Sequence, residues 1–182
     1  MARIALIGAS GTAGTRILPQ LVSRNHQVTA IVRDPSKVPT RAGVTAARGD
    51  VADPAGLAAV LEGHDAVISA VRFLDSDPNA LIGAVRASGV TRYLVVGGAA
   101  SLFVAPGKRL LDQPDFPAAY KDEATQGAAF LDALRGVSDL DWTFISPSAM
   151  FVPGERTGKF RLAQDELLVS EKGSPISYED FA

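Results

Sequence analysis

The sequence contains no cysteine in its 182 residues and has only two histidines. Without cysteine there is no disulfide, no thiolate metal ligand and no cysteine nucleophile, and such a chain suits a reducing compartment. His26 and His64 each precede a predicted strand, so we expect both at the edge of the sheet away from a ligand. No paired carboxylates or closely spaced histidines indicate hydrolysis or a metal site. We therefore expect a cytoplasmic protein without a metal.

A strong charge bias and long apolar runs are also missing. The formal net charge is −2, and the basic residues are scattered singly or in pairs, whereas a nucleic-acid surface needs clustered cations. No apolar run reaches the roughly 20 residues of a membrane span, and the first residues lead directly into glycines instead of forming a signal peptide. We expect neither a nucleic-acid nor a membrane partner, and the length fits one domain with its own core.

What the chain does contain is a regular alternation of short apolar segments with longer helical ones. Several apolar segments lack polar alternation, which is typical of strands covered on both faces of a parallel sheet. The predicted strands are Arg3–Gly8, Gln27–Val32, Val44–Gly49, Asp65–Val71, Arg92–Gly98 and Asp141–Ser146. The predicted helices are Thr12–Arg24, Pro54–Leu61, Pro78–Ser88 and Lys121–Arg135, two of them with an aspartate cap before their first proline, Asp53 and Asp77. This alternation predicts an α/β fold, a doubly wound parallel sheet in a single domain of residues 1–182.

The segment Ser101–Pro117 is a long proline-containing connection between the fifth strand and the helix that follows it. A loop of this length inside a compact domain is more often functional than not. We expect it to cover a ligand at the strand ends with apolar side chains. The residues expected to form this acceptor pocket are Leu102, Phe103 and Phe116 on the loop, with Met150 and Phe151 opposite.

The last residues, "ISYEDFA", predict a helix with Ser177 as its N-cap and Asp180 in the capping-box position. About one helical turn follows, and a helix of that length is not stable alone. We therefore expect a longer C-terminal helix in the native protein than this sequence contains.

Three glycines spaced three apart follow the first strand in "LIGASGTAGTRIL". In a doubly wound sheet, ligands lie at the carboxyl ends of the strands, beside the point where the strand order reverses. Gly8 would form the tight turn, Gly11 would let a pyrophosphate approach the helix N-terminus, and Gly14 would let the helix pack on the strand. A glycine-rich turn without a ligand is the alternative, but the position between strand and helix favours a dinucleotide. The residues expected to contact it are Gly8, Ser10, Gly11, Thr12, Ala13 and Gly14.

The residue after the second strand distinguishes between the two nicotinamide cofactors. An acidic side chain there would bind the ribose of NAD(H), whereas arginine accommodates the 2′-phosphate of NADP(H). The strand ends in "AIVRDPSK", so Arg33 occupies this position and Lys37 adds a second positive charge. Asp34 precedes Pro35 and is interpreted as a turn cap. A solvated Arg33–Asp34 pair is the alternative; the sequence favours NADP(H), with NAD(H) as the second choice.

With these features the chain resembles the atypical short-chain dehydrogenase/reductases. Within them it is most similar to the NmrA-like, NAD(P)H-binding branch that includes flavin reductases similar to biliverdin-IX-beta reductase. The resemblance covers nearly all of the chain, and the segments that carry it lie between Gly8 and Leu162: "GASGTAG", "VRDPSKV", "GDV", "ISAV", "VVGGAAS" and "LDWTFISPSAMFVPGERTGKFRL". The last of them, with glycines and basic residues after the sixth strand, resembles a small-reductase subgroup named NADH-flavin reductases.

The resemblance implies a Rossmann-like NAD(P)-binding fold and assigns further cofactor contacts along the strand ends. The residues so implied are Asp50 and Val51 at the adenine, Ser69, Ala70 and Val71 at the pyrophosphate and ribose, Gly97 and Gly98 near the nicotinamide ribose, and Pro147 beside the nicotinamide.

A catalytic feature of that superfamily is missing from this sequence. Its members place tyrosine and lysine four residues apart on one helix face, where the lysine favours proton transfer by the tyrosine. Here Tyr120 and Lys121 are adjacent and so point about 100° apart on a helix. Tyr120 is still the best catalytic candidate, with Lys121 beside it at the cofactor, although a partly buried aromatic at a helix start is the alternative. Ser101 matches the position of the superfamily's serine and is the second catalytic candidate.

Hydride transfer is the chemistry that remains, because the cofactor carries the reaction and the protein holds donor and acceptor together. An oxidised flavin or a quinone takes its proton from solvent, which makes a missing catalytic tyrosine tolerable. We expect an NADPH-dependent oxidoreductase whose small-molecule electron acceptor is a flavin, a quinone or a related conjugated compound. The alternative is a non-catalytic redox sensor, since NmrA-like proteins use the bound dinucleotide as a signal. A sugar-nucleotide epimerase would need the missing tyrosine–lysine pair.

Overall fold

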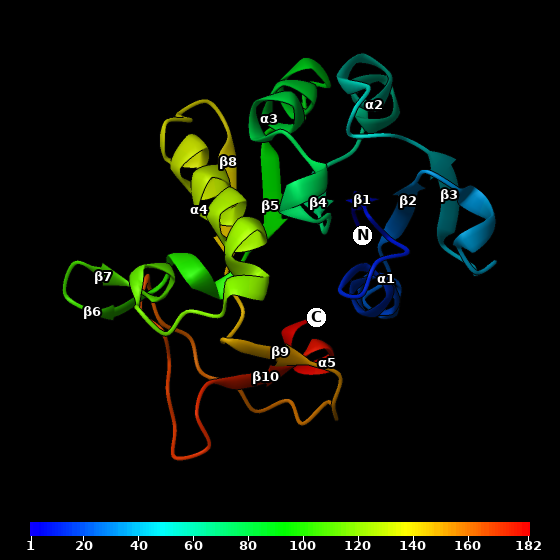
Figure 1. Cartoon of the computed structure of the whole chain (residues 1–182). Coiled ribbons are helices and arrows are strands. Elements are labelled where there is room, and N and C mark those ends of the chain that lie inside the picture. Colours follow the sequence, from blue (N-terminus) through cyan, green and yellow to red (C-terminus); the bar gives the residue numbers. More distant parts are fainter.

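The computed structural model describes residues 1–182 as a six-stranded sheet with helices on both faces (Figure 1). The strand order is β3-β2-β1-β4-β5-β8 and every neighbouring pair is parallel, which confirms the predicted doubly wound fold. The strand order reverses between β1 and β4, so the switch point of the sheet lies there. The strands are β1 (Arg3–Ile7), β2 (Gln27–Val32), β3 (Val44–Arg48), β4 (Ala66–Ser69), β5 (Arg92–Val96) and β8 (Asp141–Ile145).

Two hydrophobic cores, one on each face of the sheet, explain why the strands lack polar alternation. In β1, Ala5 and Ile7 belong to the core on one face, while Leu6 belongs to the core on the other. The helices are α1 (Gly14–Ser23), α2 (Pro54–Leu61), α3 (Pro78–Ala87), α4 (Lys121–Arg135) and α5 (Tyr178–Phe181). Figure 1 shows α1 and α5 on one face and α2, α3 and α4 on the other. No helix combines the length and the apolar character that a membrane span requires.

The aspartate–proline signals mark the true starts of α2 and α3. The Asp53 carboxylate accepts a hydrogen bond from the Gly56 N–H at 3.0 Å. Asp77 accepts hydrogen bonds from the Asn79 and Ala80 N–H groups at 2.7 and 3.2 Å. Both helices therefore begin where the sequence predicts, because each cap satisfies N–H groups that have no partner inside the helix.

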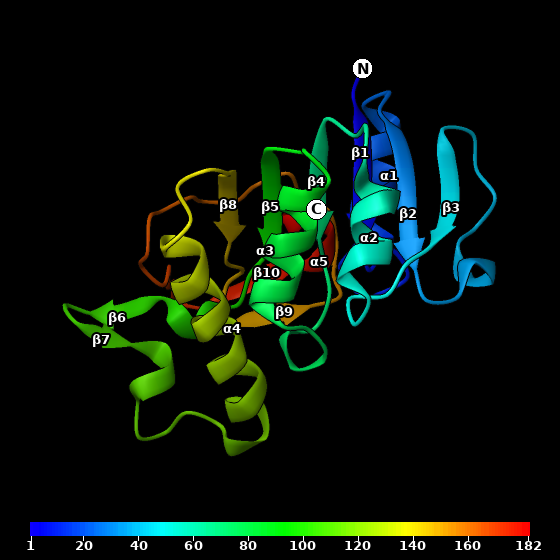
Figure 2. The same ribbon diagram turned by 90° about the horizontal axis from the view of Figure 1, so that it is seen from above.

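The segment Ser101–Pro117 differs from the predicted ligand cover. It forms a small antiparallel hairpin, β6 (Phe103–Ala105) and β7 (Lys108–Arg109). The Phe103 N–H donates to the Asp165 carbonyl at 2.7 Å, and the Phe103 carbonyl accepts from the Leu167 N–H at 2.9 Å. Figures 1 and 2 show the hairpin extending away from α1, on the far side of α4. The segment is thus held by the C-terminal part of the chain and does not roof the switch point.

The C-terminal part of the chain forms a small layer on the α1 side of the sheet (Figure 1), with β9 and β10 near the carboxyl ends of the strands (Figure 2). Here β9 (Met150–Val152) pairs in parallel with β10 (Pro175–Ser177), and α5 follows directly. The Ser177 hydroxyl accepts a hydrogen bond from the Asp180 N–H at 3.0 Å, so the predicted N-cap is confirmed. A capping box would also need the Asp180 carboxylate to bond back to the Ser177 N–H, and this part of the prediction is wrong. The Asp180 carboxylate instead accepts hydrogen bonds from Thr157 and from the Gly158 N–H.

Candidate functional site

The turn between β1 and α1 has two glycines that the protein itself requires. Gly8 has a φ of +80°, and a Cβ there would lie 2.6 Å from the Ala70 carbonyl oxygen at the end of β4. A Cβ at Gly14 would overlap the Gly8 carbonyl oxygen and would lie 2.9 Å from the Ala9 Cα. The turn therefore needs bare backbone at both positions, one for the close approach of β4 and one for the packing of α1.

Gly11, between them, is different. Its N–H donates to the Gly8 carbonyl at 2.9 Å, which closes the turn. The atoms nearest to a Cβ at this position would be the Gly8 and Ala70 carbonyl oxygens, at 3.2 and 3.6 Å. The protein could accommodate a methyl group there with a small displacement. Packing within the chain thus accounts less well for glycine at residue 11 than at residues 8 and 14.

The N-terminus of α1 is the natural place for an anion in this turn. No side chain caps the helix, in contrast to α2 and α3, and its first turn has no acidic residue. The N-terminal end of a helix carries a partial positive charge, although in α1 the Thr15 and Arg16 N–H groups already donate to the Gly11 and Ala13 carbonyls. Ser10 and Thr12 lie exposed on the same turn and add hydroxyl groups. This arrangement fits the pyrophosphate of a dinucleotide.

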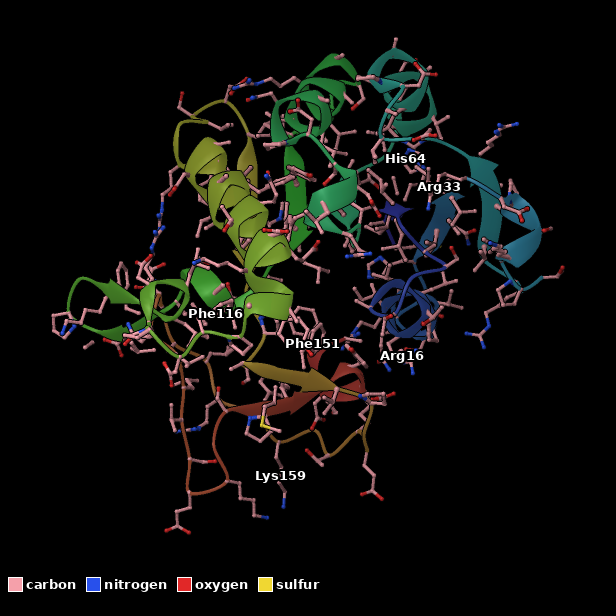
Figure 3. The ribbon with its side chains drawn as sticks, viewed as in Figure 1. Arg16, Arg33, His64, Phe116, Phe151 and Lys159 are labelled. Carbon is pink, nitrogen blue, oxygen red and sulfur yellow. The ribbon has the colours of Figure 1, made fainter.

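At the end of β2, Arg33 and Lys37 are exposed, and neither forms an ion pair (Figure 3). The Asp34 carboxylate accepts hydrogen bonds from the Ser36 hydroxyl at 2.7 Å and the Ser36 N–H at 3.1 Å. These bonds lower the pKa of Asp34 and confirm its role as a turn cap. Arg33 is therefore not held by its neighbour and is available to a ligand.

The residues that follow β3 and β4 lie on either side of the glycine turn, which follows β1 in the sheet order β3-β2-β1-β4. Asp50 accepts a hydrogen bond from the Ala52 N–H at 3.0 Å, and Val51 packs against the core. Ser69 is 1% exposed at the end of β4. Ala70 and Val71 both approach Gly8, since the Val71 Cγ1 lies 3.1 Å from the position of a Cβ there. The structure thus brings these predicted cofactor residues to one edge of the sheet.

The chain beyond Val71 is held by a residue that the sequence analysis missed. The Glu123 carboxylate, in the first turn of α4, accepts hydrogen bonds from the Phe73 N–H at 2.8 Å and the Leu74 N–H at 3.1 Å. The Arg72 guanidinium lies 3.7 Å from the same carboxylate. From sequence, an acidic residue at the start of a helix indicates only a favourable interaction with the helix dipole.

At the end of β5 the packing of the chain requires glycine at residue 97 but not at residue 98. A Cβ at Gly97 would overlap the Phe144 ring on β8, and one at Gly98 would lie 3.7 Å from the Phe73 ring. Ser101, in the turn that follows, is 7% exposed, and its hydroxyl donates to the Gly98 carbonyl at 3.3 Å. This turn packs against α4, so Ser101 and the helix that begins after Tyr120 are neighbours in the fold.

Tyr120 is the most exposed of the three tyrosines. It immediately precedes α4, is 67% exposed and forms no side-chain hydrogen bond that caps the helix. Lys121 is exposed beside it. Tyr93 is fully buried in β5, where burial raises the pKa of its phenol. Tyr178 packs edge-on against Phe151, with the ring centroids 4.3 Å apart.

Two cavities in the C-terminal part of the chain do not lie at the glycine turn. One of about 610 Å³ runs along β8, between that strand and the extended segment 160–168, and it includes Pro147 at its carboxyl end. Of the five residues predicted to form an acceptor pocket, only Leu102 lines it. The predicted pocket is therefore wrong: Phe103 pairs with the C-terminal segment, Met150 is 53% exposed, and the Phe151 ring packs against α5. Figure 3 shows Phe116 and Phe151 on separate parts of the chain.

Both histidines lie at the opposite edge of the sheet, as predicted. The His26 Nδ1 accepts a hydrogen bond from the Ala2 N–H at 3.2 Å. The His64 ring bonds to the Leu61 carbonyl at 2.9 Å and to the Thr29 hydroxyl at 2.7 Å. These contacts hold the turns that precede β2 and β4, so the histidines are structural.

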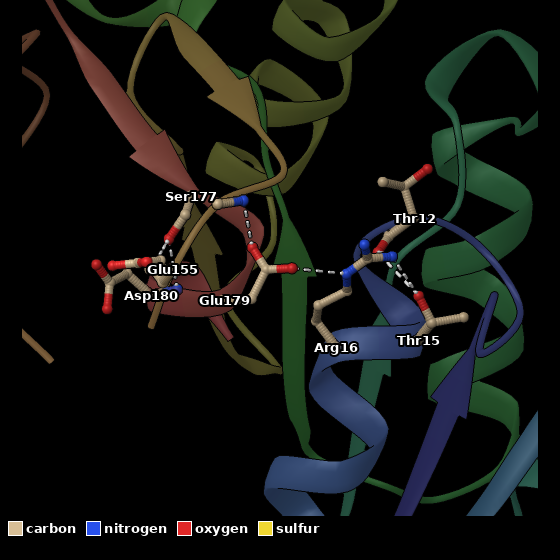
Figure 4. A network of polar contacts seen from close by, with 8 residues as sticks. Thr12, Thr15, Arg16, Glu155, Ser177, Glu179 and Asp180 are labelled. Atoms are coloured by element: carbon tan, nitrogen blue, oxygen red, sulfur yellow. Dashed lines mark hydrogen bonds and ion pairs between the residues drawn. The ribbon is translucent and has the colours of Figure 1, made fainter. Parts of the chain in front are cut away.

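One polar network connects the glycine turn to the C-terminal layer (Figure 4). Arg16, in the first turn of α1, donates to the Thr12 carbonyl at 3.3 Å and to the Glu179 carboxylate at 3.2 Å. Glu179 also accepts from the Gly154 N–H at 2.9 Å. The Arg16 guanidinium lies 5.6 Å from the centre of the Tyr178 ring, which adds a cation–π contact.

Comparison with known proteins agrees with this geometry. The family model described as NAD(P)H-binding matches residues 8–182. Three solved structures align with 99–100% of this chain, and the alignments span 87–89% of their own chains. They share 46, 37 and 37% sequence identity with it, at TM-scores of 0.89, 0.92 and 0.83. Their names, all given as putative, are an exported protein from Burkholderia pseudomallei, an epimerase from Bacteroides thetaiotaomicron and an NADH-flavin reductase from Streptococcus pneumoniae.

Proposed function

Because this chain belongs to the NAD(P)H-binding family, NmrA-like in type, we propose that it is an NADPH-dependent reductase. Its acceptor in this proposal is a flavin, a quinone or a related conjugated compound. The bound nicotinamide supplies the hydride. The chain's own residues bind and orient the cofactor and keep one face of it open to the acceptor.

Gly11 is the observation that carries the cofactor half of the proposal. The chain's packing demands glycine at residues 8 and 14, but at residue 11 it leaves room for a small side chain. Glycine at residue 11 is accounted for by a pyrophosphate close to the backbone at the uncapped start of α1. The same turn would then hold the two phosphates through N–H groups and the hydroxyls of Ser10 and Thr12.

The preference for NADPH rests on Arg33 and Lys37. Both are exposed at the end of β2, and neither forms an ion pair. Asp34, which could have served as the ribose-binding acid of an NAD enzyme, is engaged with Ser36. Two exposed cations, with the nearby aspartate already bonded to Ser36, favour a 2′-phosphate at this position.

The acceptor class rests on the chemistry that the site lacks. Tyr120 has no lysine at the spacing that activates a phenol, and Ser101 is buried and bonded to the Gly98 carbonyl. Reduction of an ordinary ketone, or epimerisation of a sugar, needs a proton donor or acceptor from the protein. A flavin or quinone needs none, and one relative of 37% identity bears the name of an NADH-flavin reductase.

The test is spectrophotometric oxidation of NADPH and NADH with a panel of acceptors. The panel contains riboflavin, FMN, FAD, a soluble quinone and, as a control, a simple ketone. The proposal expects faster oxidation of NADPH than of NADH with the flavins or the quinone, and no turnover of the ketone. Tight binding of NADPH without oxidation by any acceptor would contradict the reductase and favour a redox sensor.

A further inference from the structure

The Glu123 carboxylate ties α4 to the chain that leaves β4. It accepts two backbone N–H bonds, from Phe73 at 2.8 Å and from Leu74 at 3.1 Å, and it lies 3.7 Å from the Arg72 guanidinium. Phe73 is 8% exposed and inserts beneath α4. A Cβ at Gly127 of α4 would lie only 2.9 Å from this ring, so helix and turn are in tight contact.

This turn is continuous with the residues that approach the glycine turn. Ala70 lies three residues before Phe73, and its carbonyl packs closely against Gly8. The segment from Ala70 to Leu74 is therefore fixed at one end by β1 and at the other by Glu123. It crosses the switch point on the side of β4 and β5, which belongs to the second mononucleotide-binding half of a doubly wound fold.

We propose that Glu123 is a positioning residue for the nicotinamide half of the cofactor. It acts through the turn Arg72–Asp75, which it holds against α4, and so sets the course of the chain that continues from Ala70 and Val71 along the crevice. This inference rests on the proposed cofactor site but not on the identity of the acceptor. Glu123 touches neither reactant.

The structure offers a matched control on the same helical turn. Asp122 is a carboxylate beside Glu123 in the first turn of α4, and it is exposed. Its replacement removes the same charge from the helix N-terminus but leaves the two backbone bonds intact. Arg72 is 68% exposed at its side chain, so the ion pair contributes little, and the two N–H bonds are the contact to test.

The experiment compares Glu123→Ala, Glu123→Gln and Asp122→Ala with the wild-type chain. Each is titrated with NADPH and with 2′,5′-ADP, which carries only the adenosine half of the cofactor. We expect Glu123→Ala to raise the dissociation constant of NADPH roughly tenfold, because binding would then have to order the released turn. Its affinity for 2′,5′-ADP should change by less than about twofold, since the first mononucleotide half is untouched. Glu123→Gln should fall between, because one amide oxygen can serve only one of the two N–H groups.

Amide hydrogen exchange of the free protein provides a readout without any cofactor. We expect the Phe73 and Leu74 amides to exchange faster in Glu123→Ala and to be unchanged in Asp122→Ala. The inference is overturned if these amides are unaffected, if the two affinities fall equally, or if Asp122→Ala behaves like Glu123→Ala. A wild type that binds NADPH but reduces no acceptor would overturn the proposed reductase and leave these comparisons valid.

Discussion

Arg16 on α1 and Glu179 on α5 are 163 residues apart in the chain and form a hydrogen bond of 3.2 Å. The same carboxylate accepts the Gly154 N–H at 2.9 Å, so one side chain joins the glycine turn, the C-terminal helix and the chain after β9. Asp180, its neighbour, receives the Thr157 and Gly158 N–H groups at 2.7 and 2.8 Å. The segment Gly154–Gly158 is thus held by the two carboxylates of α5 rather than by a core of its own.

Glu179→Gln should release this segment without unfolding the protein. The amide loses the charge that pairs with Arg16 and offers only one oxygen to two donors. We expect trypsin to cleave severalfold faster after Arg156, with the melting temperature nearly unchanged, because the pair is partly exposed. Glu171→Gln, at an exposed carboxylate of the same C-terminal part, is the control. Equal cleavage of the two variants and the wild type would show that the carboxylate does not hold the segment.

Acid should release the same segment. The Gly154 N–H, with Arg16, lowers the pKa of Glu179, and the Thr157 hydroxyl, with two N–H groups, lowers the pKa of Asp180. A carboxyl group with a lowered pKa stabilises the folded contact fully above its ordinary pKa of about 4 and loses that effect as the pH falls through the lowered value. The amide resonances of Thr157 and Gly158 should therefore be constant from pH 7 to about 5 and shift at lower pH. In Asp180→Asn that shift should be absent; its persistence would exclude Asp180 as its origin.

Local signals in the sequence predicted most of the fold and part of the site. The sheet, the caps at Asp53 and Asp77 and the turn at Asp34 depend on residues within a few positions of one another, so spacing alone identifies them. Glu123 and Phe73 are 50 residues apart, and nothing in the spacing pairs them. The predicted acceptor pocket failed for the same reason, because the backbone of Phe103 is bonded to Asp165 and Leu167 rather than placed over the strand ends.

Gly11→Val should abolish cofactor binding and leave the fold largely intact. A branched side chain would occupy the space that the pyrophosphate needs, while its Cβ meets only two carbonyl oxygens of the protein. We expect the dissociation constant of NADPH to rise by roughly 10²-fold or more. The binding free energy lost is then about twice that of a tenfold change. Gly83→Val on α3, where a Cβ would meet no atom of another part of the chain within 4 Å, is the matched control and should bind normally. Wild-type affinity in Gly11→Val would mean that the turn is structural only.

Arg33→Asp should shift the preference from NADPH towards NADH. The change removes a charge-assisted contact to the 2′-phosphate, worth roughly 1.5–3 kcal/mol, and supplies an acceptor for ribose hydroxyls. Titration of both cofactors against the wild type and the variant measures the shift. Arg41→Asp makes the same charge change at an exposed position before β3 and should leave the ratio of affinities unaltered. Equal affinity of the wild type for the two cofactors would refute the role given to Arg33.

Tyr120→Phe and Ser101→Ala should each reduce turnover by less than about tenfold, below the usual 10²–10⁴-fold effect of losing a general acid. Tyr120 is 67% exposed before α4 and has no lysine to activate it, so its loss removes at most a contact to the acceptor. The Ser101 hydroxyl is committed to the Gly98 carbonyl at 3.3 Å. Its loss should lower stability by about 0.5–1.5 kcal/mol, so turnover is compared well below the melting temperature. A several-thousandfold loss in either variant, with NADPH affinity unchanged, would identify a proton donor. The acceptor would then be a compound that cannot take its proton from solvent, and flavins and quinones would no longer be the expected class.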